Sequence, residues 1–178
     1  MFILLFMKIR KGYFFMNAIF SKKELLDNDS CDGYYDAVSD LIENELVLQM
    51  KEYIQHGDTT TFQHCVNVSY YNYKLCRFFG WDAVSCARAG LLHDFFLYDW
   101  HDDYNLLHGI THPKVALKNA DKYFELNECE KDIILKHMFP LTITPPKYKE
   151  TVIIVLVDKY CGLIETVGHM LEKVRSKI

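Results

Sequence analysis

Hydrophobic residues recur at intervals of three and four positions along most of the chain, which is the spacing of one helix face. The first such segment covers residues 35–54. Three consecutive threonines open a second, 59–79, and Gly80 gives it a stop signal. Asp82 can cap a third helix over residues 83–93. The first half of the chain therefore predicts three helices in succession.

The second half begins with an irregular stretch, residues 95–111, which is aromatic, acidic and rich in histidine. A loop of that length in a compact domain is usually functional. Pro113 suits the first turn of a fourth helix over residues 113–124. Asn127, with a glutamate three positions later, resembles a capping box and opens a fifth helix over residues 127–137.

Three prolines between residues 140 and 146 disfavour helix until about Tyr148. A long helix then covers residues 149–166, and a short polar helix follows Gly168. Strand signals are weak, because the β-branched run at 151–157 continues directly into a helical pattern. The pattern therefore predicts an all-α, single-domain helical bundle of six or seven helices.

Composition agrees with a globular protein of one domain, since half of the 178 residues are hydrophobic and a quarter are charged. The formal net charge of −4 gives no basic surface, so a nucleic-acid partner is not indicated. None of the six cysteines forms a Cys-x-x-Cys pair, and most fall in apolar helical patterns. Buried, reduced thiols and a cytoplasmic location are expected.

The N-terminal region needs a separate interpretation. Its apolar patches, residues 1–7 and 13–20, are each too short to span a bilayer, and no stable membrane span is predicted. Residues 1–30 are expected to be an N-terminal extension, either a start placed upstream of Met16 or a hydrophobic tail packed on the body. Residues 31–178 are expected to form the domain.

Six potential metal ligands carry most of the functional information, and each falls at a helix end or on a helix. They are His64, His93, Asp94, His112, His137 and Asp158. Imidazole and carboxylate ligands suit Fe, Mn, Ni, Zn or Mg, so one or two divalent ions are expected. Any one of the histidines alone is more often structural. Asp158, however, follows a buried apolar run, and an unpaired buried carboxylate is costly.

The residues around these ligands resemble a known family, the HD-domain superfamily of metal-dependent phosphohydrolases. Residues 87–94, Ala-Arg-Ala-Gly-Leu-Leu-His-Asp, resemble its Ala-x-Leu-Leu-His-Asp helix, and residues 112–116 resemble the His-Pro-x-x-Gly/Ala segment of its binuclear members. The resemblance covers about residues 45–165. One departure is that Phe95-Phe96-Leu97 stands where many members have Ile-Gly-Lys, so a cation that often assists with phosphate is missing.

The resemblance implies one metal on His64, His93, Asp94 and Asp158, and a second on Asp94, His112 and His137. Asp94 would bridge the two and is the expected catalytic residue. It also implies hydrolysis of a nucleotide or another small phosphate ester by a metal-bound hydroxide, which two metals can generate near neutral pH. A small-molecule phosphate is thus the expected partner, and the oligomeric state is not predicted.

Several other residues are weaker candidates. Lys114 and Lys159 adjoin ligands in sequence and are expected substrate contacts, although each also fits a solvated surface cation. His108 in the irregular stretch is expected to touch substrate, and His56 and His169 are interpreted as surface residues. The remaining candidates are Arg88, as a weak phosphate contact or partner for Asp158, and three carboxylates of the irregular stretch as proton donors, Asp99, Asp102 and Asp103.

Two other functions stay open on the same residues. HD-fold proteins with all six ligands include di-iron oxygenases, which cleave C–C or C–P bonds instead of hydrolysing phosphate. A regulatory binding module with a vestigial site is the third hypothesis, and the complete set of ligands argues against it. Phosphate hydrolysis is preferred as the commoner use of the fold, which is an argument from analogy.

Overall fold

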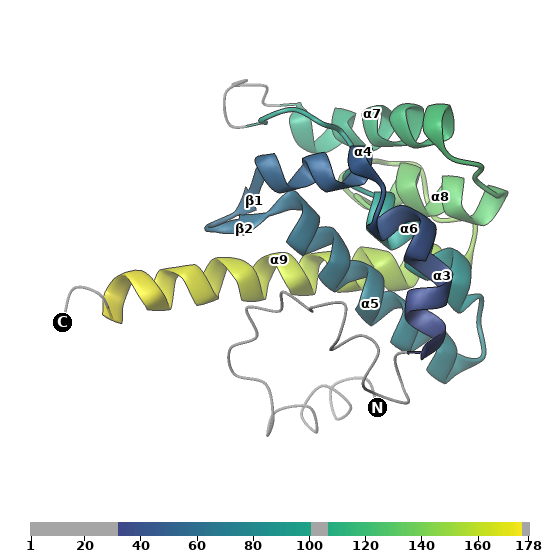
Figure 1. Ribbon diagram of the computed structural model, residues 1–178, viewed down its shortest axis with the longest axis horizontal. Coiled ribbons are helices and arrows are strands. Elements are labelled where there is room, and N and C mark those ends of the chain that lie inside the picture. Colours follow the sequence, from purple (N-terminus) through teal and green to yellow (C-terminus); the bar gives the residue numbers. More distant parts are fainter. Residues whose placement is uncertain (1–31, 101–106, 176–178) are drawn as a thin grey trace.

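The structure is a computed structural model, and it describes residues 32–100 and 107–175. The described part is helical apart from one short β-hairpin, so the predicted all-α fold is confirmed (Figure 1). The elements in chain order are α3 (Asp32–Ile42), α4 (Glu45–Leu48), the 3₁₀ helix η2 (Gln49–Glu52), β1 (Ile54–His56), β2 (Thr59–Thr60), α5 (Thr61–Phe79), α6 (Ala83–Leu92), α7 (His108–Tyr123), α8 (Glu128–Lys136) and α9 (Lys149–Arg175). The expected N-terminal extension lies outside the described residues.

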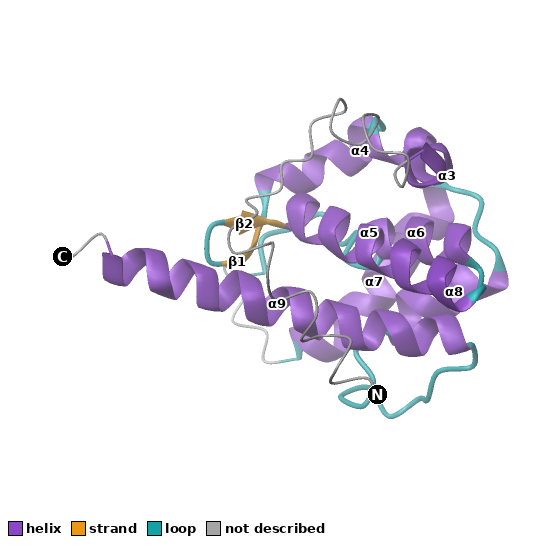
Figure 2. Ribbon diagram, turned by 90° about the horizontal axis from the view of Figure 1, so that it is seen from below, coloured by secondary structure: helices purple, strands orange, loops and turns teal. Residues whose placement is uncertain are grey.

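The antiparallel pair α5 and α6 forms the centre of the domain, with α3 and α4 on one side and α9 on the other (Figure 2). The predicted caps hold these helices in place. Thr60 and Gln63 form a capping box at the start of α5, and Gly80 ends that helix in the left-handed conformation, with φ +67°. Asp82 caps α6 by accepting a hydrogen bond from the backbone N–H of Ser85.

The two central helices approach each other closely at Gly90. A Cβ atom there would lie 2.8 Å from Cα of Ser69 and 3.2 Å from Nδ2 of Asn72. The Ser69 hydroxyl, which is fully buried, donates to the carbonyl of Ala87 at 2.6 Å. This contact sets the position of the C-terminal end of α6, where the His-Asp doublet follows.

Helices α7, α8 and α9 cover the same end of the central pair. Asp132 on α8 joins two of them, because its Oδ2 accepts from the backbone N–H of Lys147 at 2.9 Å and from the hydroxyl of Thr151 at 2.7 Å. The buried residues of α9 lie between Glu150 and Cys161. Its remaining turns reach beyond the other helices and expose Leu163, Met170 and other apolar side chains (Figure 1).

Three helix boundaries differ from the sequence prediction. The expected helix 35–54 breaks at Asn44, whose side chain accepts from the N–H of Leu46 and so starts a new helix. Helix α7 begins at His108, five residues before Pro113, which therefore lies inside it. Helix α9 continues through Gly168, where a separate short helix was expected, so propensity alone overstated this glycine as a break.

The β-hairpin replaces the end of that first expected helix. Its turn residue Gly57 has φ +61° and packs directly on His169 of α9. In the described residues, 32–100 and 107–175, we find no helix that combines the length and the hydrophobicity needed to cross a membrane.

We predict opposite effects for alanine at two helical glycines. Gly90→Ala should lower the free energy of unfolding by about 1–2 kcal/mol, because overpacking against the backbone of Ser69 outweighs the gain in helix propensity. Gly168→Ala should raise it by about 0.5–1 kcal/mol, since nothing lies within 4 Å of the added methyl group. Urea unfolding of both variants checks this, and a stabilised Gly90→Ala variant would contradict the close approach.

Candidate metal centre

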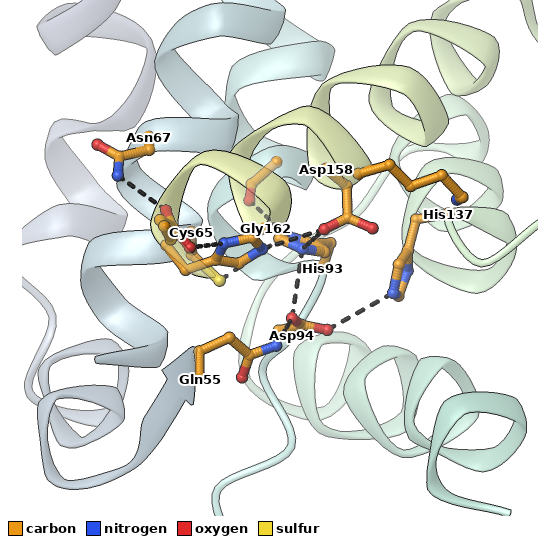
Figure 3. A network of polar contacts seen from close by, with 12 residues as sticks. Gln55, Cys65, Asn67, His93, Asp94, His137, Asp158 and Gly162 are labelled. Carbon is orange, nitrogen blue, oxygen red and sulfur yellow. Dashed lines mark hydrogen bonds and ion pairs between the residues drawn. The ribbon is translucent and has the colours of Figure 1, made fainter. Parts of the chain in front are cut away.

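The His93-Asp94 doublet lies at the C-terminal end of α6, with His93 as the C-cap. Both side chains are buried, His93 completely. Nε2 of His93 lies 3.4 Å from Oδ2 of Asp94 and 3.7 Å from Oδ1 of Asp158 on α9. Figure 3 shows His93, Asp94, Asp158 and His137 turned toward one another from three different helices or helix ends. Residues far apart in sequence therefore converge here.

His64 completes the first half of the cluster from the first turn of α5. Its Nε2 lies 3.1 Å from Oδ1 of Asp158, and its Nδ1 lies 2.8 Å from Oε2 of Glu165. The imidazole is fully buried, whereas the carboxylate of Asp158 retains 14% exposure. The four residues predicted as ligands of a first metal, His64, His93, Asp94 and Asp158, are therefore together.

His112 and His137 form the second half. Their Nε2 atoms are 2.8 Å apart, and they lie 3.2 and 3.5 Å from Oδ1 of Asp94. His112 is the fifth residue of α7, and His137 is the C-cap of α8. Asp94 therefore turns one oxygen toward this pair and the other toward His93, as a bridging carboxylate does.

All four imidazoles have the same orientation. Each Nδ1 faces an acceptor: a carboxylate oxygen for His64, and the carbonyls of Gly90, His108 and Ile134 for His93, His112 and His137, at 2.8–2.9 Å. The shared pattern assigns a proton to Nδ1 and turns Nε2 toward the carboxylates. Each Nε2 atom, once it carries no proton, therefore has a lone pair that a cation between the rings and the carboxylates could accept.

Two atoms at the centre are left without a hydrogen-bond partner among the described residues, Nε2 of His93 and Oδ1 of Asp94. Buried polar atoms without partners are costly. Ligand atoms of His64, His93 and Asp94 lie within 4.8 Å of one another, and so do those of Asp94, His112 and His137. The donor set and the unpartnered atoms both fit two metal ions sharing Asp94.

Without a metal, protons compensate the two buried aspartates. Burial opposes protonation of His64, but its hydrogen bonds to Asp158 and Glu165 raise its pKa to about 10. Burial likewise opposes protonation of His93, but the charge of Asp94 raises its pKa well above the usual range. Burial and the positive charge of His93 lower the pKa of His137 to about 3. His64 and His93 are thus protonated and His137 is neutral.

Sequence reasoning missed two polar partners of the cluster. Nε2 of Gln55, on β1, donates to Oδ2 of Asp94 at 2.6 Å. Glu165 lies on α9 seven residues after Asp158, two turns along the same face, so its spacing was a usable signal. No comparable spacing marked Gln55, because it lies on a β-hairpin that the apolar pattern of the sequence did not predict.

His56 and His169 were wrongly interpreted as surface residues. The His56 ring is partly buried, with its centroid 5.4 Å from that of His64, and burial and the charge of His64 lower its pKa. His169 is also partly buried, and its Nδ1 contacts a carboxylate oxygen of Asp58 at 2.7 Å. The hairpin places His56 against Gly162 of α9 and its turn against His169 of the same helix, which the sequence pattern did not predict.

The predicted substrate contacts have different positions. His108 stacks on the ligand candidate His112, with ring centroids 4.7 Å apart. Lys159 is exposed, and its Nζ donates to the carbonyls of Phe139 and Val155 at 3.3 Å. Lys114 is exposed two residues after His112 on α7, a spacing at which helical side chains do not face each other.

Arg88 and the three aspartates of the irregular stretch were weaker candidates for the site. Arg88 forms ion pairs with Asp40 at 2.6 Å and Glu130 at 3.3 Å, so it does not compensate Asp158 as the sequence allowed. Asp102 and Asp103 lie outside the described residues. Asp99 is described, and it lies next to Tyr98, whose ring packs on Phe96 beside His108. Leu97, between these two aromatics, has a left-handed backbone with φ 56°.

The metal-free chain should be most stable near pH 6.5. The raised pKa of His64 contributes stability that is complete below pH 6.5 and is lost as the pH rises toward about 10. The lowered pKa of His137 contributes stability that is lost as the pH falls from 6.5 toward about 3. Urea midpoints in chelator at pH 5, 6.5 and 8.5 check this. A midpoint that keeps rising to pH 8.5 would refute it, and His64→Gln should reduce the alkaline decline, leaving the part that His93 contributes.

Comparison with known proteins agrees with this geometry. The family model of the HD domain matches residues 61–163, more than half of the chain and the span from α5 to α9 that contains the cluster. No curated protein and no solved structure matches the chain. The resemblance noted in the sequence is confirmed, and this chain belongs to the HD domain family, a superfamily of all-α, metal-dependent hydrolases.

Proposed function

We propose that this chain is a binuclear phosphohydrolase that acts on a small phosphate ester, nucleotides included. The observation that carries the proposal is the convergence of three imidazole Nε2 atoms on the carboxylate of Asp94, with His64 beside them on Asp158. Oδ1 of Asp94 and Nε2 of His93 have no hydrogen-bond partner among the described residues. A purely structural cluster would pair these atoms, because a buried polar atom without a partner costs about 1–3 kcal/mol.

The proposed ligands divide into two sets that share one residue. His64, His93, Asp94 and Asp158 would hold the first ion, and Asp94, His112 and His137 the second. Nitrogen and carboxylate oxygen donors favour Fe, Mn, Ni, Zn or Mg over metals that prefer thiolates. Cys65, whose Sγ lies 3.7 Å from Nδ1 of His93, is on the side of that ring away from the proposed ion.

When bound, the two ions would lower the pKa of a coordinated water toward neutrality and offset the charge of a phosphate. Other groups of the chain would orient the ligands of these ions. Gln55 holds one oxygen of Asp94 by donating from its amide, and the carbonyls of Gly90, His108 and Ile134 fix three imidazole rings. Asp94 is therefore the proposed catalytic residue, because it would contact both ions.

Residues at the edge of the cluster would contact the substrate. His108 is the best-supported of these, since it stacks on His112 and its other ring face stacks on Trp100. Lys159 follows Asp158 and is exposed, so it is the better placed of the two predicted lysines, and Lys114 is retained as a weaker proposal. The cytoplasmic location expected from the cysteines stays a prediction.

The proposal predicts two metal ions per chain and phosphate release that depends on them. Asp94→Asn should lower turnover by more than about a hundredfold, because an outer partner of a metal ligand already contributes about 10–100-fold. His169→Ala is the matched control, since His169 contacts Asp58 outside the cluster, and it should retain both ions and turnover. Elemental analysis of anaerobically purified protein, followed by phosphate release from nucleotides and simple phosphate esters, measures both quantities.

Two results would overturn the proposal. Turnover that persists in Asp94→Asn with full metal occupancy would show that Asp94 does not bridge. A chain that holds only iron, releases no phosphate and consumes oxygen with its substrate would instead be a di-iron oxygenase on the same ligands.

A further inference from the structure

Glu165 is a buried carboxylate that lies directly behind the proposed ligand His64. Its Oε2 is 2.8 Å from Nδ1 of His64, and its side chain is 9% exposed. The opposite ring nitrogen of His64, Nε2, faces Asp158 at 3.1 Å. The imidazole is therefore held between two carboxylates of the same helix, α9, one at the cluster and one outside it.

The second oxygen of Glu165 is also occupied. Nδ2 of Asn67, one turn after His64 on α5, donates to Oε1 at 3.1 Å (Figure 3). The carboxylate is thus fixed at both oxygens by two side chains of one helix. Glu165 cannot rotate without losing one of these contacts, so it presents a defined acceptor to Nδ1 of His64.

We infer that Glu165 is a positioning residue for the first metal, an inference that rests on the proposed function. By accepting the proton of Nδ1 it keeps the lone pair of His64 on Nε2, aimed at the position beside Asp158 and His93. A carboxylate in this place orients the ring and makes the imidazole a stronger ligand. The three other histidines use backbone carbonyls instead, so His64 is distinguished by a charged partner.

A different reading is that Glu165 is itself a metal ligand, because ligand atoms of His56, His64 and Glu165 lie within 4.8 Å of one another. That third site would need the lone pair of Nδ1, and His64 would have to lose both ring protons to serve two ions. The hydrogen bond from Nδ1 to Glu165 needs no such loss. The contacts therefore favour positioning over a third ion.

Titration of the metal-free full chain with Mn²⁺, followed by the EPR signal of free aqueous Mn²⁺, tests this without reference to activity. Glu165→Gln keeps an acceptor for His64, and the amide of Asn67 can turn to accept from it. Glu165→Leu removes the acceptor. Glu172→Gln is the matched control, because Glu172 is exposed one heptad further along the same helix. Thermal unfolding of each metal-free variant reports folding separately.

We expect two Mn²⁺ ions per wild-type chain. One of them should be held about tenfold more weakly in Glu165→Gln and about a hundredfold more weakly in Glu165→Leu. The affinity of the other should be unchanged, since His112 and His137 do not contact Glu165, and Glu172→Gln should match the wild type. A graded loss confined to one site is not the result of general destabilisation, which would weaken both.

Each other result has a definite meaning. Equal weakening in Glu165→Gln and Glu165→Leu would show that only the charge acts, and unchanged affinities would remove any role for Glu165. Three ions in the wild type and two in Glu165→Gln would make Glu165 a ligand. All three overturn the positioning role but leave the binuclear site. A wild-type chain that binds no Mn²⁺ and no other divalent ion would instead overturn the proposed function.

Discussion

The buried carboxylate of Asp94 is the constraint on which the rest of this structure depends. It is 2% exposed, and Nε2 atoms of three imidazoles, those of His93, His112 and His137, lie 3.2–3.5 Å from its oxygens. A buried charge is tolerated only if cations or hydrogen bonds compensate it. In the metal-free chain a proton on His93 contributes to that compensation, as a proton on His64 does for Asp158, and metal ions would take the place of both. Folding and the proposed metal binding would therefore be coupled through the same atoms.

The helices bring these side chains together at their ends. His64 is in the first turn of α5, directly after its capping box, while His93 and His137 are the C-caps of α6 and α8. At a helix end the side chain can turn into the centre while its Nδ1 donates to a free carbonyl of the last turn, as His93 does to Gly90 and His137 to Ile134. The unsatisfied backbone carbonyls at the ends of α6 and α8 thus orient the proposed ligands His93 and His137.

Much of the order of helices and of the positions of the proposed ligands on them could be predicted from the sequence. Capping residues mark helix ends independently of tertiary contacts. Thr60, Asp82 and Asn127 located three helices correctly, and four of the six proposed ligands lie near the ends of these helices: His64, His93, Asp94 and His137. The sequence prediction failed where tertiary contacts determine the bounds of a helix. Asn44 ends a helix that the apolar pattern continues, and α9 continues past Gly168. Gln55 was missed because its position depends on a β-hairpin, whereas Glu165 had a usable helical spacing from Asp158 that the prediction did not use.

The central claim, that nitrogen and oxygen donors hold a pair of ions around Asp94, is tested most directly by X-ray absorption at the edge of the metal that the anaerobically purified chain contains. The account predicts a first shell of nitrogen and oxygen only, with scattering from imidazole rings and a second metal at about 3.5–4 Å. A sulfur neighbour at about 2.3 Å, or a spectrum without imidazole scattering, would contradict it.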